Sequence, residues 1–130
     1  LYGDRICEGW IGELLAPQNP RELAANIGQI LNSPVVFCDS GKPIKTIVVC
    51  GGSGSFLTEQ VIEAGYDCLV TSQLKHEDVI MAKAAGLSLI DATHFGTEIH
   101  IASMLQEKLA QQFTDIEVVL AKESNPLKSI

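Results

Sequence analysis

The sequence predicts a three-layer α/β fold, in which a largely parallel or mixed sheet carries helices on both faces. From Ile44 onward, short apolar runs alternate with segments whose apolar residues recur at helical spacing. The short runs are apolar nearly throughout, which is typical of strands that are buried on both faces and joined by helical crossovers. The 130 residues suit one domain, so we expect a single α/β domain over residues 1–130.

The first part of the chain predicts a strand-like segment, one helix and a short strand. Asn19 is suited to cap the helix, Pro20 fits its first position, and Glu22 lies near its positive end. The apolar face of this helix then comprises Leu23, Ile27, Ile30 and Leu31. A short strand is expected at Val35–Cys38, followed by a turn at Ser40–Pro43.

The later elements alternate regularly along the chain. Further strands are expected at Ile44–Cys50, Cys68–Val70, Leu87–Ile90 and Ile116–Leu120. The first three should be parallel, with the last one added alongside. Helices between them should end at Gly65 and Gly86, because glycine readily adopts the left-handed conformation that closes a helix. The last helix has apolar residues at spacings of three and four, namely Ala102, Leu105, Leu109 and Phe113.

Charge and composition exclude several classes of protein. The net charge is −7 and the nine Lys and Arg residues are scattered singly, so direct binding to nucleic acid is not expected. No apolar stretch approaches the roughly 18 residues that a membrane-spanning helix needs. The cysteines are Cys7, Cys38, Cys50 and Cys68. They form no C-x-x-C pair, and three of them lie in apolar runs, so we interpret them as buried thiols of a reducing, cytoplasmic protein.

The loop G-G-S-G-S, residues 51–55, lies between a predicted strand and a predicted helix. Backbone N–H groups in such a loop can bind an anion, which makes Gly52, Ser53 and Gly54 candidates for holding a substrate phosphate. The loop lacks the lysine of a P-loop and the third glycine of a dinucleotide-binding fingerprint. A tight turn requires the same glycines without any ligand, and we favour that interpretation slightly.

A second candidate site lies in D-A-T-H-F-G-T-E, residues 91–98. His94 and Glu98 are four residues apart, so on a helix they share one face and could ligate a transition metal together. Spacing alone favours an ordinary helix start, because two residues do not complete a metal site. His100 should point about 120° away around the helix. Lys75 and His76 belong to a polar cluster that suits the solvated first turn of a helix, and a functional role for them is the weaker alternative.

Five segments in order carry a resemblance to a known family. They are W-I-G-E-L, I-V-V-C-G-G-S-G-S, D-C-L-V-T-S-Q-L-K-H-E-D, G-L-S-L-I-D-A-T-H-F-G-T-E and E-S-N-P-L-K. Together they resemble the C-terminal part of the Nif-three-like family, the dinuclear-metal-centre proteins that are often labelled GTP cyclohydrolase I type II homologues. This sequence departs from the usual pattern of the family in two places. The family commonly has T-G-D-x-K-Y-H-D where this chain has residues 71–78, and Thr93 replaces a usual glycine.

The resemblance implies a role for His94 as a metal ligand and for Glu98 as a carboxylate that bridges two metal ions. It implies that the other ligands, a histidine pair and an aspartate, belong to an N-terminal half that these 130 residues do not contain. We therefore expect the intact protein to bind two divalent ions, whether zinc, manganese or iron, and this chain alone to bind none tightly. Ring-like homo-oligomers of the intact protein are also implied.

Two functions of different class follow from the resemblance. The first is a metal-dependent hydrolase acting on a nucleotide or another phosphorylated small molecule, with no catalytic residue assigned beyond the metal ligands. The second is a non-catalytic, metal-binding oligomeric scaffold or regulatory interaction protein.

Overall fold

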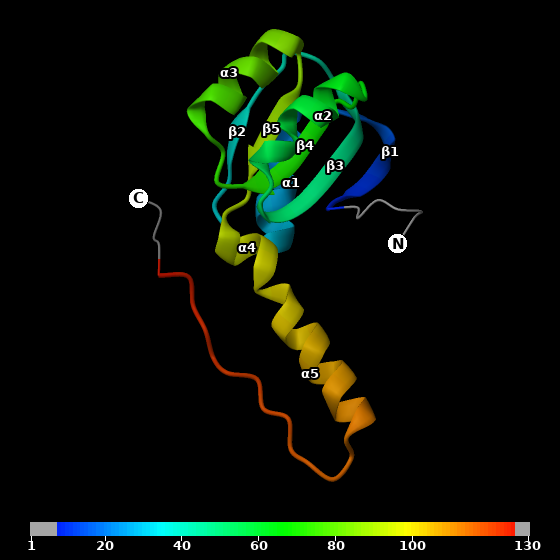
Figure 1. Ribbon diagram of the computed structural model, residues 1–130, viewed down its shortest axis with the longest axis vertical. Coiled ribbons are helices and arrows are strands. Elements are labelled where there is room, and N and C mark those ends of the chain that lie inside the picture. The colour runs from blue at the N-terminus through cyan, green and yellow to red at the C-terminus, as the bar shows by residue number, and fades with distance from the viewer. Residues whose placement is uncertain (1–7, 127–130) are drawn as a thin grey trace.

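The computed structural model describes residues 8–126, so Cys7 lies outside the described residues. Figure 1 shows a sheet with one helix, α1, on one face and two helices, α2 and α3, on the other. A further helix, α5, extends away from these layers, and the last part of the chain runs back beside it. The three-layer α/β fold predicted from the sequence is confirmed.

The sheet has five strands in the order β1-β3-β4-β5-β2. Their bounds are β1 (Trp10–Gln18), β2 (Val36–Cys38), β3 (Ile44–Ser53), β4 (Cys68–Ser72) and β5 (Ser88–Asp91). The three central strands β3, β4 and β5 are parallel, as predicted, and Leu69 of β4 lies level with Val48 of β3 and Leu89 of β5. The edge strands β1 and β2 are antiparallel to their neighbours. The sheet is therefore mixed, with a parallel centre.

Helices α1 and α3 begin and end where local sequence signals predict, whereas His94 and His100, expected on one helix from the sequence, lie on the two separate helices α4 and α5. The bounds of the helices are α1 (Pro20–Leu31), the 3-10 helix η1 (Ser55–Leu57), α2 (Thr58–Glu63), α3 (His76–Ala85), α4 (His94–Glu98) and α5 (His100–Gln112). Oδ1 of Asn19 accepts a hydrogen bond from the backbone N–H of Arg21 at 2.9 Å, which caps α1. Gly86 follows α3 with φ +79°, the left-handed conformation that glycine adopts without a steric penalty. Within residues 8–126, no helix has the length and hydropathy needed to cross a membrane.

The strand predicted at Ile116–Leu120 is not formed. In the described part of the chain, residues 113–126 contain no strand or helix, and Ile116, Val119 and Leu120 are exposed. Apolar and β-branched residues favour a strand only where a neighbouring strand offers hydrogen bonds and a surface to pack on. Here β1 and β2 occupy the two edges of the sheet, and α5 carries the chain away from it (Figure 1).

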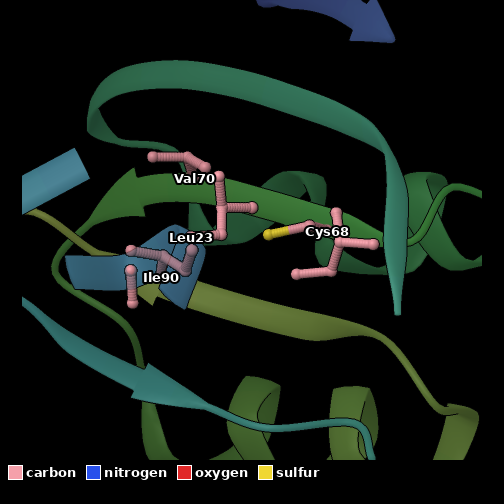
Figure 2. Packing of buried hydrophobic residues seen from close by; sticks show 6 residues of the cluster. Leu23, Cys68, Val70 and Ile90 are labelled. Carbon is pink, nitrogen blue, oxygen red and sulfur yellow. The ribbon is translucent and has the colours of Figure 1, made fainter. Parts of the chain in front are cut away.

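Two layers of buried side chains fix the sheet between its helices. The layer under α1 consists of Leu23, Ala24, Ile44, Cys68, Val70 and Ile90, and Figure 2 shows part of it. The opposite layer consists of Val48, Val61, Leu69, Ala82, Leu87 and Leu89. Successive residues of β4 alternate between the two layers, because side chains along a strand point to opposite faces. All five residues of β4 are buried, which explains its unbroken apolar start.

The cysteines of the described residues are free, and two of them are buried. Cys50 and Cys68 belong to the core, whereas Cys38 is half-buried. Burial, and next the charge of Asp67, raise the pKa of the Cys68 thiol to about 12. A thiol with that pKa remains protonated near neutral pH and is a poor nucleophile and metal ligand. This agrees with the interpretation of the strand cysteines as structural residues.

Candidate functional site at the carboxyl ends of the central strands

The carboxyl ends of β3, β4 and β5 bring three segments together. The glycine loop ends β3, the residue after β4 is Gln73, and α4 follows β5 after a two-residue connection. Ligand sites of parallel sheets lie at this edge. The two candidate segments of the sequence are in direct contact there, since the N–H of Gly52 donates a hydrogen bond to Oγ1 of Thr97 at 3.2 Å.

His94 and Glu98 form the centre of this site. Nδ1 of His94 lies 3.1 Å from Oε1 of Glu98, as their four-residue spacing on one helix face predicts. Nε2 of His94 lies 3.0 Å from Oε1 of Gln73. The side chains of His94 and Glu98 are 47% and 55% exposed, so both can be reached from solvent.

Gly52 is shaped for close approach to this pair. A Cβ atom at position 52 would lie 2.6 Å from Oε1 of Glu98 and 3.9 Å from Cε1 of His94. Its φ of +71° is also a conformation that other residues adopt only with strain. Glycine is therefore required here for two separate reasons, and one of them is contact with the candidate site.

The glycine loop uses its own N–H groups to hold its shape. The N–H of Gly54 donates to Oγ1 of Thr71 at 2.9 Å, while that hydroxyl donates to the carbonyl oxygen of Gly52 at 3.0 Å. With the N–H of Gly52 bonded to Thr97, two loop donors already have partners. This geometry favours the tight-turn interpretation. The anion-binding role of Gly52, Ser53 and Gly54 stays a prediction, with Ser53 the exposed member of the three.

Thr97 ties the site together and was not singled out from the sequence. Its Oγ1 accepts from Gly52, lies 3.0 Å from Oγ of the fully buried Ser72, and donates to the carbonyl oxygen of Thr93 at 3.0 Å. Its hydroxyl thereby joins α4 to both β3 and β4. The available signal was the four-residue spacing from Thr93, which places the Thr97 hydroxyl over the start of the helix.

Asp91, at the end of β5, fixes the two loops on either side of the site. Its Oδ1 accepts from the N–H of Thr93 at 2.9 Å, and its Oδ2 accepts from the N–H of Leu74 at 3.2 Å. Thr93 and Gln73 both have positive φ, +62° and +58° respectively. The φ of Thr93 gives a backbone reason why a glycine suits this position. The Thr93 hydroxyl offsets that strain by accepting from the N–H of Gly96 at 3.1 Å and so capping α4.

The other candidate residues lie apart from the central pair. Lys75 precedes α3 and His76 is its first residue, and both are exposed, as a solvated helix start predicts. Within residues 8–126, no hydrogen bond or ion pair joins either of them to His94 or Glu98. His100 begins α5 and lines a separate hollow of about 840 Å³ together with Leu31 and Phe95.

The donors present fit part of a metal centre. Imidazole and carboxylate are suitable ligands for divalent transition metals, and His94 and Glu98 are reachable and adjacent. Within residues 8–126 no group of three or more His, Cys, Asp and Glu side chains is placed to hold an ion. A protein site usually needs about three such ligands, so the pair is suited to a centre that further residues complete.

The structure is that of a mixed α/β domain with polar residues at the carboxyl ends of its parallel strands, and comparison with known proteins identifies the family. The chain belongs to the Duf34/NIF3 (NGG1p interacting factor 3) family, whose sequence profile matches residues 6–126. This confirms the resemblance seen in the sequence segments.

Individual relatives agree with this family and with the fold. A Pseudomonas aeruginosa protein named GTP cyclohydrolase 1 type 2 homolog is 30% identical over 116 residues, which are 89% of this chain and 46% of the relative. A Staphylococcus aureus crystal structure matches with TM-score 0.79 and 30% identity, over 94% of this chain and 37% of the other. The ybgI protein, of unknown function, matches with TM-score 0.83 and 27% identity, over 92% and 49%. The chain thus spans less than half the length of each.

Proposed function

We propose that this chain contributes His94 and Glu98 to a divalent-metal centre in a hydrolase that acts on a nucleotide or another phosphorylated small molecule. The observation that carries the proposal is the meeting of this pair with the glycine loop at the carboxyl ends of three parallel strands. Both side chains are half exposed, and Gly52 lets β3 approach them closely.

Each residue of the site has a separate role in this proposal. His94 would bind an ion through Nε2 after displacement of the Gln73 amide that contacts this nitrogen, while Nδ1 contacts Glu98. Glu98 would use its carboxylate to bridge two ions. Divalent ions in such a centre supply Lewis-acid polarisation of a phosphoryl oxygen and an activated water. Thr97 and Asp91 hold the two ligand-bearing segments in place through the hydrogen bonds described above.

The remaining ligands are proposed to come from outside these residues. The matched relatives are more than twice as long as the aligned part, which supports the proposal that this chain acts as the C-terminal part of a longer protein. Two protein ligands leave most coordination positions of even one ion to water. We therefore assign the activity to the completed centre.

The proposed substrate class is based on the name of a relative and on exposed polar residues that follow β3 and β4. The name GTP cyclohydrolase 1 type 2 homolog suggests a nucleotide. Ser53 of the glycine loop, Lys75 and His76 are exposed polar groups that follow β3 and β4, and they are proposed contacts for a phosphate. The free cysteines of the described residues support a cytoplasmic location, where thiols stay reduced.

Turnover of GTP and of simple phosphoesters by the full-length protein, with added zinc, manganese or iron, tests this function. Glu98→Gln should abolish metal-dependent turnover, because an amide is a poor bridging ligand. Glu59→Gln, on the exposed surface of α2, is the matched control and should leave turnover unchanged. Full turnover by the Glu98→Gln protein would refute the hydrolase.

A non-catalytic, metal-binding oligomeric scaffold is the second candidate, and α5 favours it. In the described structure α5 buries none of its thirteen residues. The exposed apolar residues of α5, together with Phe113 directly after it, are called the α5 stripe: Ile101, Met104, Leu105, Leu109 and Phe113. They are between 42% and 55% exposed, an arrangement typical of a protein–protein interface. We propose that the α5 stripe packs against a second copy of the chain, which would give the homo-oligomer implied by the resemblance.

A further inference from the structure

The side chain of Gln73 occupies the direction in which His94 would bind an ion. Oε1 of Gln73 lies 3.0 Å from Nε2 of His94, and Oε1 of Glu98 lies 3.1 Å from Nδ1 of the same ring. The imidazole is therefore contacted at both of its nitrogen atoms. The side chain that contacts Nδ1 is the carboxylate of Glu98 on α4. The side chain that contacts Nε2 is the neutral amide of Gln73, in the loop between β4 and α3.

The hydrogen bonds among Glu98, His94 and Gln73 indicate which nitrogen of the His94 imidazole carries the lone pair. A carboxylate oxygen only accepts, so the hydrogen bond to Glu98 places a proton on Nδ1 of His94. A neutral imidazole then has its lone pair on Nε2, which needs a donor. Oε1 of Gln73 cannot donate, so this tautomer requires the amide to be turned until its NH₂ group, rather than Oε1, faces Nε2. Which end of an amide faces a neighbour is assigned from the hydrogen-bond network, and the proton on Nδ1 assigns the NH₂ group to this side. An amide hydrogen and a metal cation would thus compete for one lone pair.

The backbone around Gln73 holds this side chain over the site. Gln73 has φ +58°, which is uncommon for a residue that is not glycine. Its neighbours keep it there, because Ser72 is fully buried with its hydroxyl 3.0 Å from that of Thr97, and the N–H of Leu74 donates to Asp91. The side chain itself is exposed, so its contact with His94 depends on this fixed backbone and on the hydrogen bond.

We propose that Gln73 is a removable cap on His94: its amide covers Nε2 in the metal-free protein and swings aside to admit a divalent ion. The proposal deepens the metal-centre function and rests on it for the identity of the incoming ion. Gln73 is then a positioning residue, which reserves one nitrogen of His94 and disfavours occupancy of the half-site until the remaining ligands are in place.

Covalent modification of histidine tests the cap without any metal. Diethylpyrocarbonate attacks a free imidazole lone pair, and mass spectrometry separates the products at His76, His94 and His100, the three histidines of the chain. In the intact protein we expect His94 to react more slowly than the other two. Gln73→Ala should accelerate only His94, by roughly 2- to 10-fold, the population change that follows from losing one hydrogen bond.

Two further variants make the test specific. Gln73→Asn keeps the amide but is one methylene shorter, so it should behave like Gln73→Ala. Gln60→Ala, on the exposed face of α2, should change no histidine. Unfolding midpoints measured alongside identify any variant that reacts faster because it has unfolded. Equal rates for His94 in the wild type and in Gln73→Ala would overturn the cap.

A metal step then separates this inference from the function on which it rests. Zinc added to the intact Gln73→Ala protein should protect His94 from the reagent, at lower concentration than in the wild type. If Gln73→Ala exposes His94 but zinc never protects it, the cap stands and the metal-centre function fails. If zinc protects His94 equally in both proteins, the metal centre stands and the cap is wrong.

Discussion

Glycine is needed at position 52 for its positive φ and for the close approach of Glu98, and comparison with Gly41 separates the two effects. At position 52 a side chain would be strained by the positive φ and would also meet Oε1 of Glu98, at 2.6 Å from Cβ. Gly41 has a similar φ of +80°, but a Cβ there would have nothing within 4 Å. The difference between the two positions therefore isolates the contact with the candidate site.

We predict that Gly52→Ala lowers the free energy of unfolding by more than Gly41→Ala does. Backbone strain alone should cost about 1 kcal/mol or somewhat more at either position. The extra loss at position 52 should come with displacement of Glu98. Urea unfolding measures the two free energies, and NMR shifts of Glu98 report its displacement. Equal losses, with Glu98 unmoved, would mean that the carboxylate adapts freely.

At the scale of the element, α4 is held to the sheet by hydroxyl groups. Thr97 is the central one, since its Oγ1 contacts β3 through Gly52 and β4 through the buried Ser72. Gly96 adds close packing, because a Cβ atom there would lie 2.6 Å from the side chain of Ser33. The attachment of α4 to the sheet therefore depends on small polar contacts more than on apolar burial.

Thr97→Val should loosen this attachment while keeping the side-chain shape. We expect a loss of about 1–3 kcal/mol in unfolding free energy, because the buried hydroxyl of Ser72 loses its partner. Amide hydrogen exchange of Gly52 should become faster, since its N–H loses the acceptor on Thr97. Thr114→Val, at an exposed position after α5, is the control and should alter neither measurement.

The elements that could be predicted from the sequence are those with a strong local signal, including α5, which buries none of its residues but has apolar residues at helical spacing. The central strands read as apolar runs because helices cover both of their faces, and α1 carries its own cap and proline. The run Ile116–Leu120 has the same composition but finds no strand edge, which composition cannot reveal. Composition therefore indicates that a segment is able to form a strand, but a strand forms only where a neighbouring strand is available to pair with it.

The site was predictable only where its residues share one element. His94 and Glu98 are four residues apart on one helix, so spacing suffices to pair them. Gln73 is 21 residues from His94, and their contact exists because β4 and β5 are adjacent and parallel. Such a contact depends on strand order, which local periodicity does not encode. Thr97 was missed because two of its partners, the N–H of Gly52 and the hydroxyl of Ser72, lie on strands distant in sequence.

For the whole molecule, Asp67 links stability to pH. Burial raises its pKa, but hydrogen bonds from the backbone of Thr46 and Lys45, the Thr46 hydroxyl and the charge of Lys42 together lower it below the usual value. The ionised form is therefore favoured in the folded state. Its contribution to stability is complete above about pH 4 and is lost as the pH falls further, through the folded-state pKa.

Asp67→Asn should accordingly make the free energy of unfolding depend less on pH in the acid range. The free energy of unfolding should fall by about 1–3 kcal/mol at neutral pH, because hydrogen bonds to a charged acceptor become bonds to an amide. The two profiles should begin to approach each other below about pH 4 and should converge below the lowered folded-state pKa of Asp67. Denaturant titrations at a series of pH values measure this, with the exposed Asp115→Asn as control. Parallel profiles at every pH would contradict the role of Asp67.

Association along α5 is a second property of the whole molecule. We predict that Leu105→Glu reduces the oligomeric state, because it places a charge in the middle of the α5 stripe. Ala110→Glu adds the same charge five residues on, about 140° around the helix, and should leave association intact. Sedimentation velocity at several concentrations measures both. A wild type that stays monomeric at every concentration would exclude this interface.

Zinc binding to the 130-residue chain alone is predicted to be weak. His94 and Glu98 supply two ligands, and no third His, Cys, Asp or Glu joins them within residues 8–126. Calorimetric titration at neutral pH should give no saturable binding tighter than about micromolar, because most coordination positions are left to water. Tighter binding that disappears in His94→Ala would show a third ligand within this chain.

Only Ile99 separates α4 from α5, and this short junction couples the two proposals. With a junction of one residue, we expect a tilt of α4, which carries the proposed metal ligands, to move α5, which carries the α5 stripe. If association along α5 changes the setting of α4, thermodynamic reciprocity requires that ion binding changes association by the same factor. The ion content of such a protein would then depend on its own cellular abundance. Dilution would act as a release signal for the ion, with no separate regulator needed.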